Sequence, residues 1–283
     1  MIEDLIYDIG MNNGDDTAYY LYKGYRVVAV EANPILVERA KERFADEIKN
    51  NRLVILNVGI SDKSGTAKFY VNDVKDEWSA FDFEIASRGL NVPPREIVVE
   101  CVRLKEILDK YGVPFYLKTD IEGNDIFVLE DLNKDDLPMY VSVEAHSLQY
   151  MCILSVLGYN SFKCIDQTNH NNPKIINNEN CLFRTGRSIH NRSFVLANFF
   201  ISRFPKVKAF IKKKLRAEIV QKADNANWVF MPGCSGPFGE DTFGDWGVLE
   251  EVTYNFLHFH FRQKSRGRIN IYGWHDIHAR LGR

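Results

Sequence analysis

Five short apolar runs, separated by segments with helical patterning, constrain the fold of this chain more than any other feature. The runs cover residues 5–9, 26–30, 53–58, 115–119 and 140–144, and the helical patterns cover 15–22, 34–48, 104–111 and 123–132. Near-continuous apolar strands that alternate with amphipathic helices are typical of a parallel sheet covered by helices on both faces. We therefore predict a doubly wound, mostly parallel α/β fold, with an extra strand at 66–71.

The pattern changes beyond residue 168. Residues 169–180 are crowded with asparagine, 193–223 and 248–264 have helical patterning, and 227–247 are irregular and rich in glycine and proline. We therefore predict a cofactor-binding domain over residues 1–168. Residues 169–283 are predicted to form a C-terminal, mainly helical or irregular appendage that shapes the substrate site.

Charge and cysteine content argue against several classes of protein. The formal net charge is −2, so overall charge gives no support for a nucleic-acid partner. The five cysteines form no C-x-x-C pair, which argues against a zinc knuckle or a disulfide framework and favours a reducing compartment. No basic leader is visible, and no apolar run approaches the roughly 20 residues that cross a bilayer. We therefore expect a cytoplasmic protein.

The turn after the first run carries the main ligand-binding signal. In an open α/β sheet, ligands bind at the carboxyl ends of the strands, where the strand order reverses. Gly10 and Gly14 lie in this turn and let the backbone approach a ligand closely. Glu31 follows the second run, where a carboxylate can accept hydrogen bonds from both ribose hydroxyls. The sequence therefore predicts a ligand that contains a ribose.

A dinucleotide is the rival ligand, but the turn fits it poorly. Asn12 and Asn13 stand where the dinucleotide-binding motif has its second and third glycines. Asp15 and Asp16 begin the following helix, where two carboxylates would repel a pyrophosphate. S-adenosylmethionine has no phosphate and carries a sulfonium and an ammonium group, which acidic surroundings suit. The alternative is that these two acids cap the helix.

The end of the third run should border an adenine. Ser61 or Asp62 would meet the exocyclic amine there. The alternative is that Asp62 is a turn residue leading into residues 63–65.

Five segments in order resemble the FkbM-type methyltransferases. They are residues 7–14, 30–34, 59–65, 117–123 and 143–146, and residues 235–241 and 274–280 resemble the tails of some longer members. The family usually has a small residue at the position of Met11 and an apolar or aromatic residue at that of Asp15. The resemblance implies a class I methyltransferase (Rossmann-like) sheet, S-adenosylmethionine as the methyl donor, and usually a hydroxyl acceptor.

Site residues carry over from this resemblance one by one. Asp8, Gly10 and Gly14 would line the methionine end, and Asp120 would lie beside the sulfonium and the acceptor. Glu31 would hold the ribose, and Ser61 and Asp62 would flank the adenine. The full predicted cofactor site comprises Asp8, Gly10, Asn12, Asn13, Gly14, Thr17, Glu31, Ala32, Asn33, Ser61, Asp62 and Asp120.

Three residues at strand ends are candidates for the chemistry of an alcohol acceptor, which must lose a proton. They are Asp120, Glu122 and His146. His146 is the preferred general base because the ordinary pKa of histidine lies near neutrality. The alternative is a structural or helix-capping histidine. Asp120 and Glu122 would also suit a divalent metal, but two carboxylates are too few to require one, so metal-free catalysis is favoured.

The tail offers weaker signals. Residues 203–216 form a basic amphipathic segment that suits anionic lipid or a phosphate-bearing glycan carrier, although a solvated helix is the simpler interpretation. His258 and His260 are two apart and do not share a helix face, so a joint metal site is not expected. Candidates to reach the acceptor cleft are His275, Asp276 and His278. Candidates for a platform that stacks on a sugar are Trp228, Phe238, Trp246 and Trp274, although aromatic packing is the favoured interpretation of these four.

Taken together, the sequence predicts an S-adenosylmethionine-dependent O-methyltransferase. The acceptor would be a hydroxyl of a sugar, of a cell-surface glycan or of its precursor. The alternatives are N- or O-methylation of a small metabolite and a non-catalytic nucleotide-binding scaffold of the same fold. A homo-oligomer is compatible with the sequence.

Overall fold

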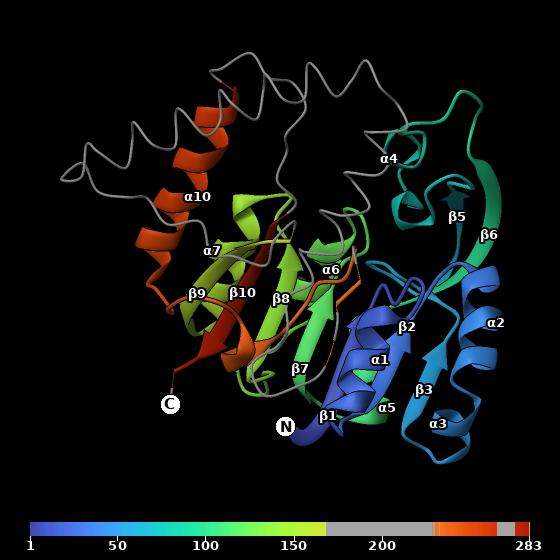
Figure 1. Ribbon diagram of the computed structural model, residues 1–283, viewed down its shortest axis with the longest axis horizontal. Helices are drawn as coiled ribbons and strands as arrows, with labels where there is room; N and C mark the ends of the chain where they lie inside the picture. Colours follow the sequence, from blue (N-terminus) through green and yellow to red (C-terminus); the bar gives the residue numbers. More distant parts are fainter. Residues whose placement is uncertain (168–227, 229, 232, 265–274, 283) are drawn as a thin grey trace.

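The computed structural model describes residues 1–167, 228, 230–231, 233–264 and 275–282, without the side chains of 166 and 258–264. Its main sheet has seven strands in the order β3-β2-β1-β7-β8-β10-β9 (Figure 1). The strands are β1 (Ile2–Ile9), β2 (Arg26–Val30), β3 (Leu53–Leu56), β7 (Pro114–Thr119), β8 (Tyr140–Glu144), β9 (Tyr159–Asp166) and β10 (His275–Leu281). Neighbours from β3 through β8 pair in parallel, whereas β10 is antiparallel to both β8 and β9.

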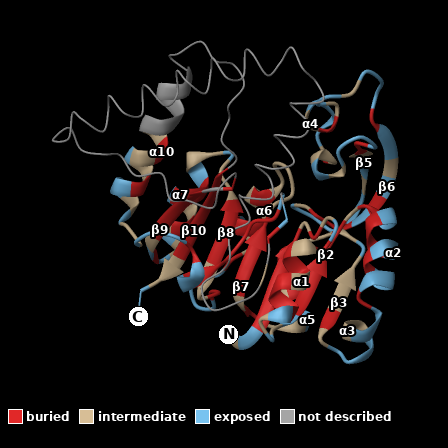
Figure 2. Cartoon of the chain, in the orientation of Figure 1, coloured by how far each residue is buried: buried red, intermediate tan, exposed pale blue. Residues whose placement is uncertain are grey.

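Helices cover both faces of this sheet. They are α1 (Asp15–Tyr22), α2 (Pro34–Arg43), α3 (Ala45–Lys49), α5 (Leu104–Tyr111), α6 (Asp125–Glu130), α7 (Leu148–Leu157) and α10 (Leu249–Lys264). Successive strand residues point to opposite faces, so Tyr7 packs in the core with α5, α6, α7 and α10, whereas Ile6 packs in the core with α1. The strands are largely buried, and the outward sides of α2 are exposed (Figure 2). The predicted doubly wound fold is confirmed.

A second, smaller sheet lies beside the carboxyl ends of β2 and β3 (Figure 1). It contains β4 (Gly59–Ile60), β5 (Gly65–Val71) and β6 (Arg95–Val102) in the order β4-β6-β5. The short helices η1 (Asp76–Trp78) and α4 (Phe83–Ala86) connect β5 to β6. The extra strand predicted at 66–71 is therefore present as β5, whereas its partner β6 was not predicted.

Strand β10 corrects the predicted organisation of the tail. The sequence placed residues 169–283 in an appendage outside the sheet, but β10 lies inside it, between β8 and β9. A central strand is usually an apolar run. In β10 the apolar core includes Ile277 and Ala279, with Leu281 packed against it, but three polar residues are also buried: His275, Asp276 and His278. The polar sequence concealed the strand.

Other predictions for the tail have different outcomes. The helix predicted at 248–264 is present as α10. The helix predicted at 193–223, the basic segment 203–216 and Trp274 lie outside the described residues, as do the side chains of His258 and His260. Among the described helices, none is both long and apolar enough to cross a membrane.

Candidate functional site

The turn between β1 and α1 lies in close contact with the turn after β7. Gly10 has a φ of +82°, and a Cβ atom there would lie 1.9 Å from the carbonyl oxygen of Asp120. Gly14 has a φ of +80°, and a Cβ atom there would lie 2.7 Å from the ring of Phe44. Both predicted glycines are therefore required by the backbone, because L side chains disfavour this φ and no space exists for them.

A buried group of charges lies directly behind the turn. The Asp8 side chain is fully buried, and its Oδ2 accepts a hydrogen bond of 2.5 Å from Thr17 Oγ1. Lys118 Nζ lies 3.2 Å from Asp8 Oδ1 and donates a hydrogen bond of 2.8 Å to the carbonyl of Gly10. Burial lowers the pKa of a lysine, but the charges of Asp8 and its acidic neighbours outweigh burial and raise the pKa of Lys118. Lys118 therefore stays charged and holds the glycine turn.

The two acids that begin α1 have separate roles. Asp15 forms an ion pair with Arg43 at 2.8 Å, near the surface. Asp16 is buried, and its Oδ2 accepts a hydrogen bond of 3.0 Å from the backbone N–H of Ser235 in the tail. The residue at the N-cap is Gly14, with no side-chain hydrogen bond, so neither acid is the cap of this helix. Burial raises the pKa of Asp16 to about 7.

This shift predicts how stability depends on pH. Between the ordinary pKa of 3.8 and the folded value of about 7, the folded chain keeps a proton that the unfolded chain has released. The free energy of unfolding therefore falls as the pH rises through this window. Asp16→Asn keeps an acceptor for Ser235 and removes the titration. Its stability relative to the wild type should grow by about 3 kcal/mol between pH 4.5 and pH 8, measured by urea unfolding.

The control for this prediction is Asp15→Asn, which changes the adjacent, less buried carboxylate. The stability of this variant relative to the wild type should not grow in the same way between pH 4.5 and pH 8. An Asp16→Asn variant whose relative stability is the same at both pH values would show that Asp16 is ionised in the folded chain throughout.

Glu31 links two turns at the end of β2. Its Oε2 accepts the backbone N–H of Asn12 at 2.8 Å, and its Oε1 accepts that of Asn33 at 2.8 Å. The Asn33 side chain in turn caps α2 by accepting from Ile35. Burial raises the pKa of Glu31. Each carboxylate oxygen has a further lone pair, so Glu31 can still accept hydrogen bonds from two hydroxyl groups of a ligand.

These elements line one cleft of about 760 Å³, within the usual size range of small-molecule sites. Of the predicted cofactor residues, the cleft is lined by Gly10, Asn12, Asn13, Glu31, Ala32 and Asp120. Asp8, Gly14, Thr17 and Asn33 are not among the lining residues and instead support the two turns from behind. The small sheet and its connection contribute aromatic side chains, namely Phe69, Trp78 and Phe81.

The structure does not bring Ser61 and Asp62 to this cleft. The lining ends with Val58, Gly59 and Ile60, and Ser61 Oγ donates instead to Asp62 Oδ1 at 3.0 Å. Phe81 fills the space beside Gly59, where a Cβ atom would lie 2.3 Å from its ring. The wall of the cleft is therefore apolar at this point. The cause is the pairing of β4 with β6, which draws the chain into the small sheet.

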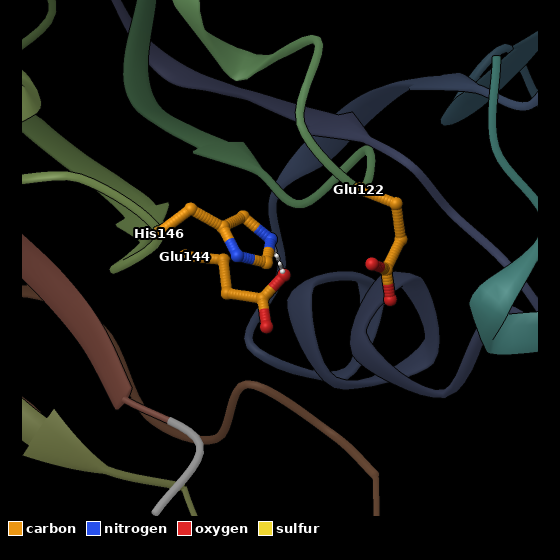
Figure 3. A group of neighbouring side chains, drawn as sticks. All are labelled: Glu122, Glu144 and His146. Carbon is orange, nitrogen blue, oxygen red and sulfur yellow. Dashed lines mark ion pairs between the residues drawn. The ribbon is translucent and has the colours of Figure 1, made fainter. Parts of the chain in front are cut away.

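Two acidic side chains in the lining of the cleft, those of Glu122 and Glu144, lie close to His146 (Figure 3). Glu122 forms a close ion pair with Arg88, and burial raises the pKa of Glu122 to about 7. Glu144 Oε2 lies 2.6 Å from His146 Nε2. Burial lowers the pKa of His146, but the hydrogen bond and charge of Glu144 outweigh it and raise this pKa to about 9. Ser147, not His146, caps α7.

Several lining residues were not predicted. Lys118 and Glu144 lie inside segments that the sequence singled out, and the available signal was a charge within or at the end of an apolar strand. Gly233, Cys234 and His275 reach the cleft from the tail. His275 had been a candidate, whereas no local pattern marks the other two.

Two of the aromatic candidates of the tail pack with core residues. Phe238 stacks on Tyr116 with a centroid separation of 4.4 Å, and Trp228 contacts Tyr19 and Tyr22. For these two, the structure agrees with the packing role that the sequence favoured. Trp246 contacts Tyr140 and lies against the cationic groups of Lys163 and Arg280.

Comparison with known proteins adds one family match. The model of the methyltransferase FkbM domain matches residues 8–163. Among solved structures, the methyltransferase FkbM from Methylobacillus flagellatus is 17% identical with a TM-score of 0.35, covering 55% of this chain and 35% of its own. The precorrin-6y C5,15-methyltransferase from Geobacter metallireducens is 15% identical with a TM-score of 0.32, covering 58% and 68%. This chain thus spans about a third of the first of these proteins. No curated protein matches it.

Proposed function

This chain belongs to the FkbM methyltransferase family, and we therefore propose that it transfers a methyl group from S-adenosylmethionine to an acceptor hydroxyl. The donor supplies a methyl group on a positively charged sulfur, which is a good leaving group. The protein then has to hold donor and acceptor in line and close together.

The observation that carries this proposal is the acidity of the cleft. Among its described lining residues, eight are Asp or Glu and three are Lys or Arg. This balance suits the sulfonium and ammonium groups of the donor and disfavours a pyrophosphate. In this proposal Glu31 would hold the ribose. Asp120, which lies beside the glycine turn, would be next to the methyl group that is transferred.

Asp120 is the group that we propose to take the acceptor proton. The sequence favoured His146, but its Nε2 already faces Glu144 at 2.6 Å and is not free to receive a proton from the acceptor. As the hydroxyl proton moves to the Asp120 carboxylate, an oxygen lone pair forms the bond to the methyl carbon. The electron pair of the broken carbon–sulfur bond stays on sulfur.

For the acceptor we propose a sugar hydroxyl, on a glycan or its precursor. The ring of Trp78 supports this class because an aromatic face packs well against a sugar ring. Trp78 lies near the proposed acceptor site, since Arg88 contacts its ring and also pairs with Glu122. Contact of residues 203–216 with an anionic surface stays a proposal, since that segment lies outside the described residues.

Calorimetric titration with S-adenosylhomocysteine tests the donor site, with NAD as the comparison ligand. We expect micromolar binding of the first and none of the second. Glu31→Gln should weaken binding by about 10- to 100-fold, because it removes charge-assisted hydrogen bonds worth roughly 1.5–3 kcal/mol each. The matched control is Glu38→Gln on the exposed side of α2, which should bind like the wild type. Preferential binding of NAD would overturn the proposal.

A further inference from the structure

We propose that Glu122, Glu144 and His146 form a binding site for a divalent cation beside the acceptor. The inference rests on the proposed function, because the cation would act on the acceptor hydroxyl. It departs from the metal-free chemistry that the sequence favoured. In the sequence, Asp120 and Glu122 alone were too few ligands to require a metal. The structure adds Glu144 at the end of β8 and His146 in the turn that follows it.

The geometry brings three ligand atoms together. One carboxylate oxygen each from Glu122 and Glu144 and one imidazole nitrogen from His146 lie within 4.8 Å of one another. In Figure 3 the carboxylate of Glu144 lies beside the His146 ring, and Glu122 points towards them from the turn after β7. All three residues line the cleft, so the remaining coordination positions would face its interior.

An independent observation comes from β10. Asp276 lies directly opposite Glu144 in the pairing of β8 with β10, so both side chains lie on the same face of the sheet. The Asp276 residue is only 2% exposed, and its Oδ1 has no hydrogen-bond partner among the described residues. Glu144 Oε2 is likewise buried, and it lies 2.6 Å from His146 Nε2. Buried carboxylate oxygens without donors are costly unless a cation or a proton compensates them.

Two carboxyl groups near the cluster have no lysine or arginine paired with them among the described residues. Arg88 pairs with Glu122, and Lys118 pairs with Asp8. Glu144 pairs instead with the imidazole of His146, and the buried Asp276 Oδ1 has no hydrogen-bond partner there. A divalent cation would replace the proton that Glu144 and His146 share. It would also draw electron density from the acceptor hydroxyl, which lowers the pKa of that hydroxyl.

The ligand set indicates which cation to use as a probe. Carboxylate oxygens suit Mg²⁺, Ca²⁺ and Mn²⁺, whereas imidazole suits Zn²⁺, Fe²⁺ and Ni²⁺. Two carboxylates and one imidazole lie between these classes. Mn²⁺ is the practical probe, because it accepts both kinds of ligand and its paramagnetism reports binding directly.

The test is a titration of the full chain with Mn²⁺, followed by electron paramagnetic resonance of the free ion. We expect one site in the wild type. Glu144→Gln and Glu122→Gln should each weaken it by about tenfold or more. The control, Glu42→Gln, removes an exposed carboxylate on α2 and should leave Mn²⁺ binding unchanged. His146→Gln provides a second route in case Glu144→Gln fails to fold, because the His146 side chain is 32% exposed.

Titration of the same samples with S-adenosylhomocysteine separates this inference from the proposed function. If S-adenosylhomocysteine binds but Mn²⁺ does not, the cation site is overturned and the donor site stands. The same holds if Mn²⁺ binds equally well to the wild type and to all three ligand variants. If Mn²⁺ binds through these residues but S-adenosylhomocysteine does not, the donor assignment fails and the cation site stands. If neither S-adenosylhomocysteine nor Mn²⁺ binds to the wild type, the donor site and the cation site are both overturned.

Discussion

Replacing Gly10 with alanine is expected to abolish binding of S-adenosylhomocysteine and to lower the free energy of unfolding by more than about 3 kcal/mol. The new Cβ atom would lie 1.9 Å from the carbonyl oxygen of Asp120, which is backbone and cannot rotate away. The φ of +82° adds a cost of roughly 1–2 kcal/mol for any L side chain. Because the turns after β1 and β7 both line the cleft, separating them would distort the donor site. Urea unfolding and calorimetry measure the two effects.

Gly24→Ala is the matched control for this prediction. Gly24 also has a positive φ, +94°, but a Cβ atom there would meet nothing within 4 Å. The variant should therefore lose only about 1 kcal/mol and bind the ligand normally. Equal losses in the two variants would mean that the close approach of Gly10 to Asp120 is not what requires the glycine.

Replacing Lys118 with methionine is expected to lower the free energy of unfolding by about 3–5 kcal/mol, because it leaves a buried charge without its partner. The variant keeps much of the side-chain volume but removes the ammonium that lies 3.2 Å from Asp8 and that donates to Gly10. The pKa of Asp16 would rise further, because the charge of Lys118 lowers it in the wild type. We expect ligand binding to weaken as well, because the glycine turn loses its anchor.

The control for Lys118 is Lys68→Met. Lys68 also pairs with a carboxylate, that of Glu96 at 2.9 Å, but its side chain is 65% exposed. Surface ion pairs contribute about 0–1 kcal/mol, so this variant should be nearly as stable as the wild type. If the two lysine variants lost the same amount of stability, Lys118 would not be compensating buried negative charge.

The fold was predictable where a strand is mainly apolar. The five runs correspond to β1, β2, β3, β7 and β8, which lie on the inner part of the sheet or at its β3 edge. The missed strands β6 (Arg95–Val102), β9 (Tyr159–Asp166) and β10 (His275–Leu281) mix polar and apolar residues. They therefore lack the near-continuous apolar character that marks a buried strand.

The site was predictable where topology places a residue at a strand end. Gly10, Glu31 and Asp120 all lie on the cleft for this reason. Cys234 and the side chain of Phe81 reach it only through the packing of distant segments, which no local pattern encodes. The position of Ser61 outside the lining also depends on distant packing, because β4 pairs with β6, a strand that the sequence did not predict.

The place of β10 in the sheet also determines the order in which the molecule assembles. Because β10 lies between β8 and β9, these two earlier strands cannot pair with each other in the native sheet. During synthesis both have an open edge until residues 275–281 emerge, and closing the long segment 167–274 costs more entropy than forming a hairpin. His275, at the start of β10, also lines the cleft. A chain that is still being synthesised therefore has no complete binding site. A ligand of the cleft would bind preferentially to molecules in which β10 has already joined the sheet.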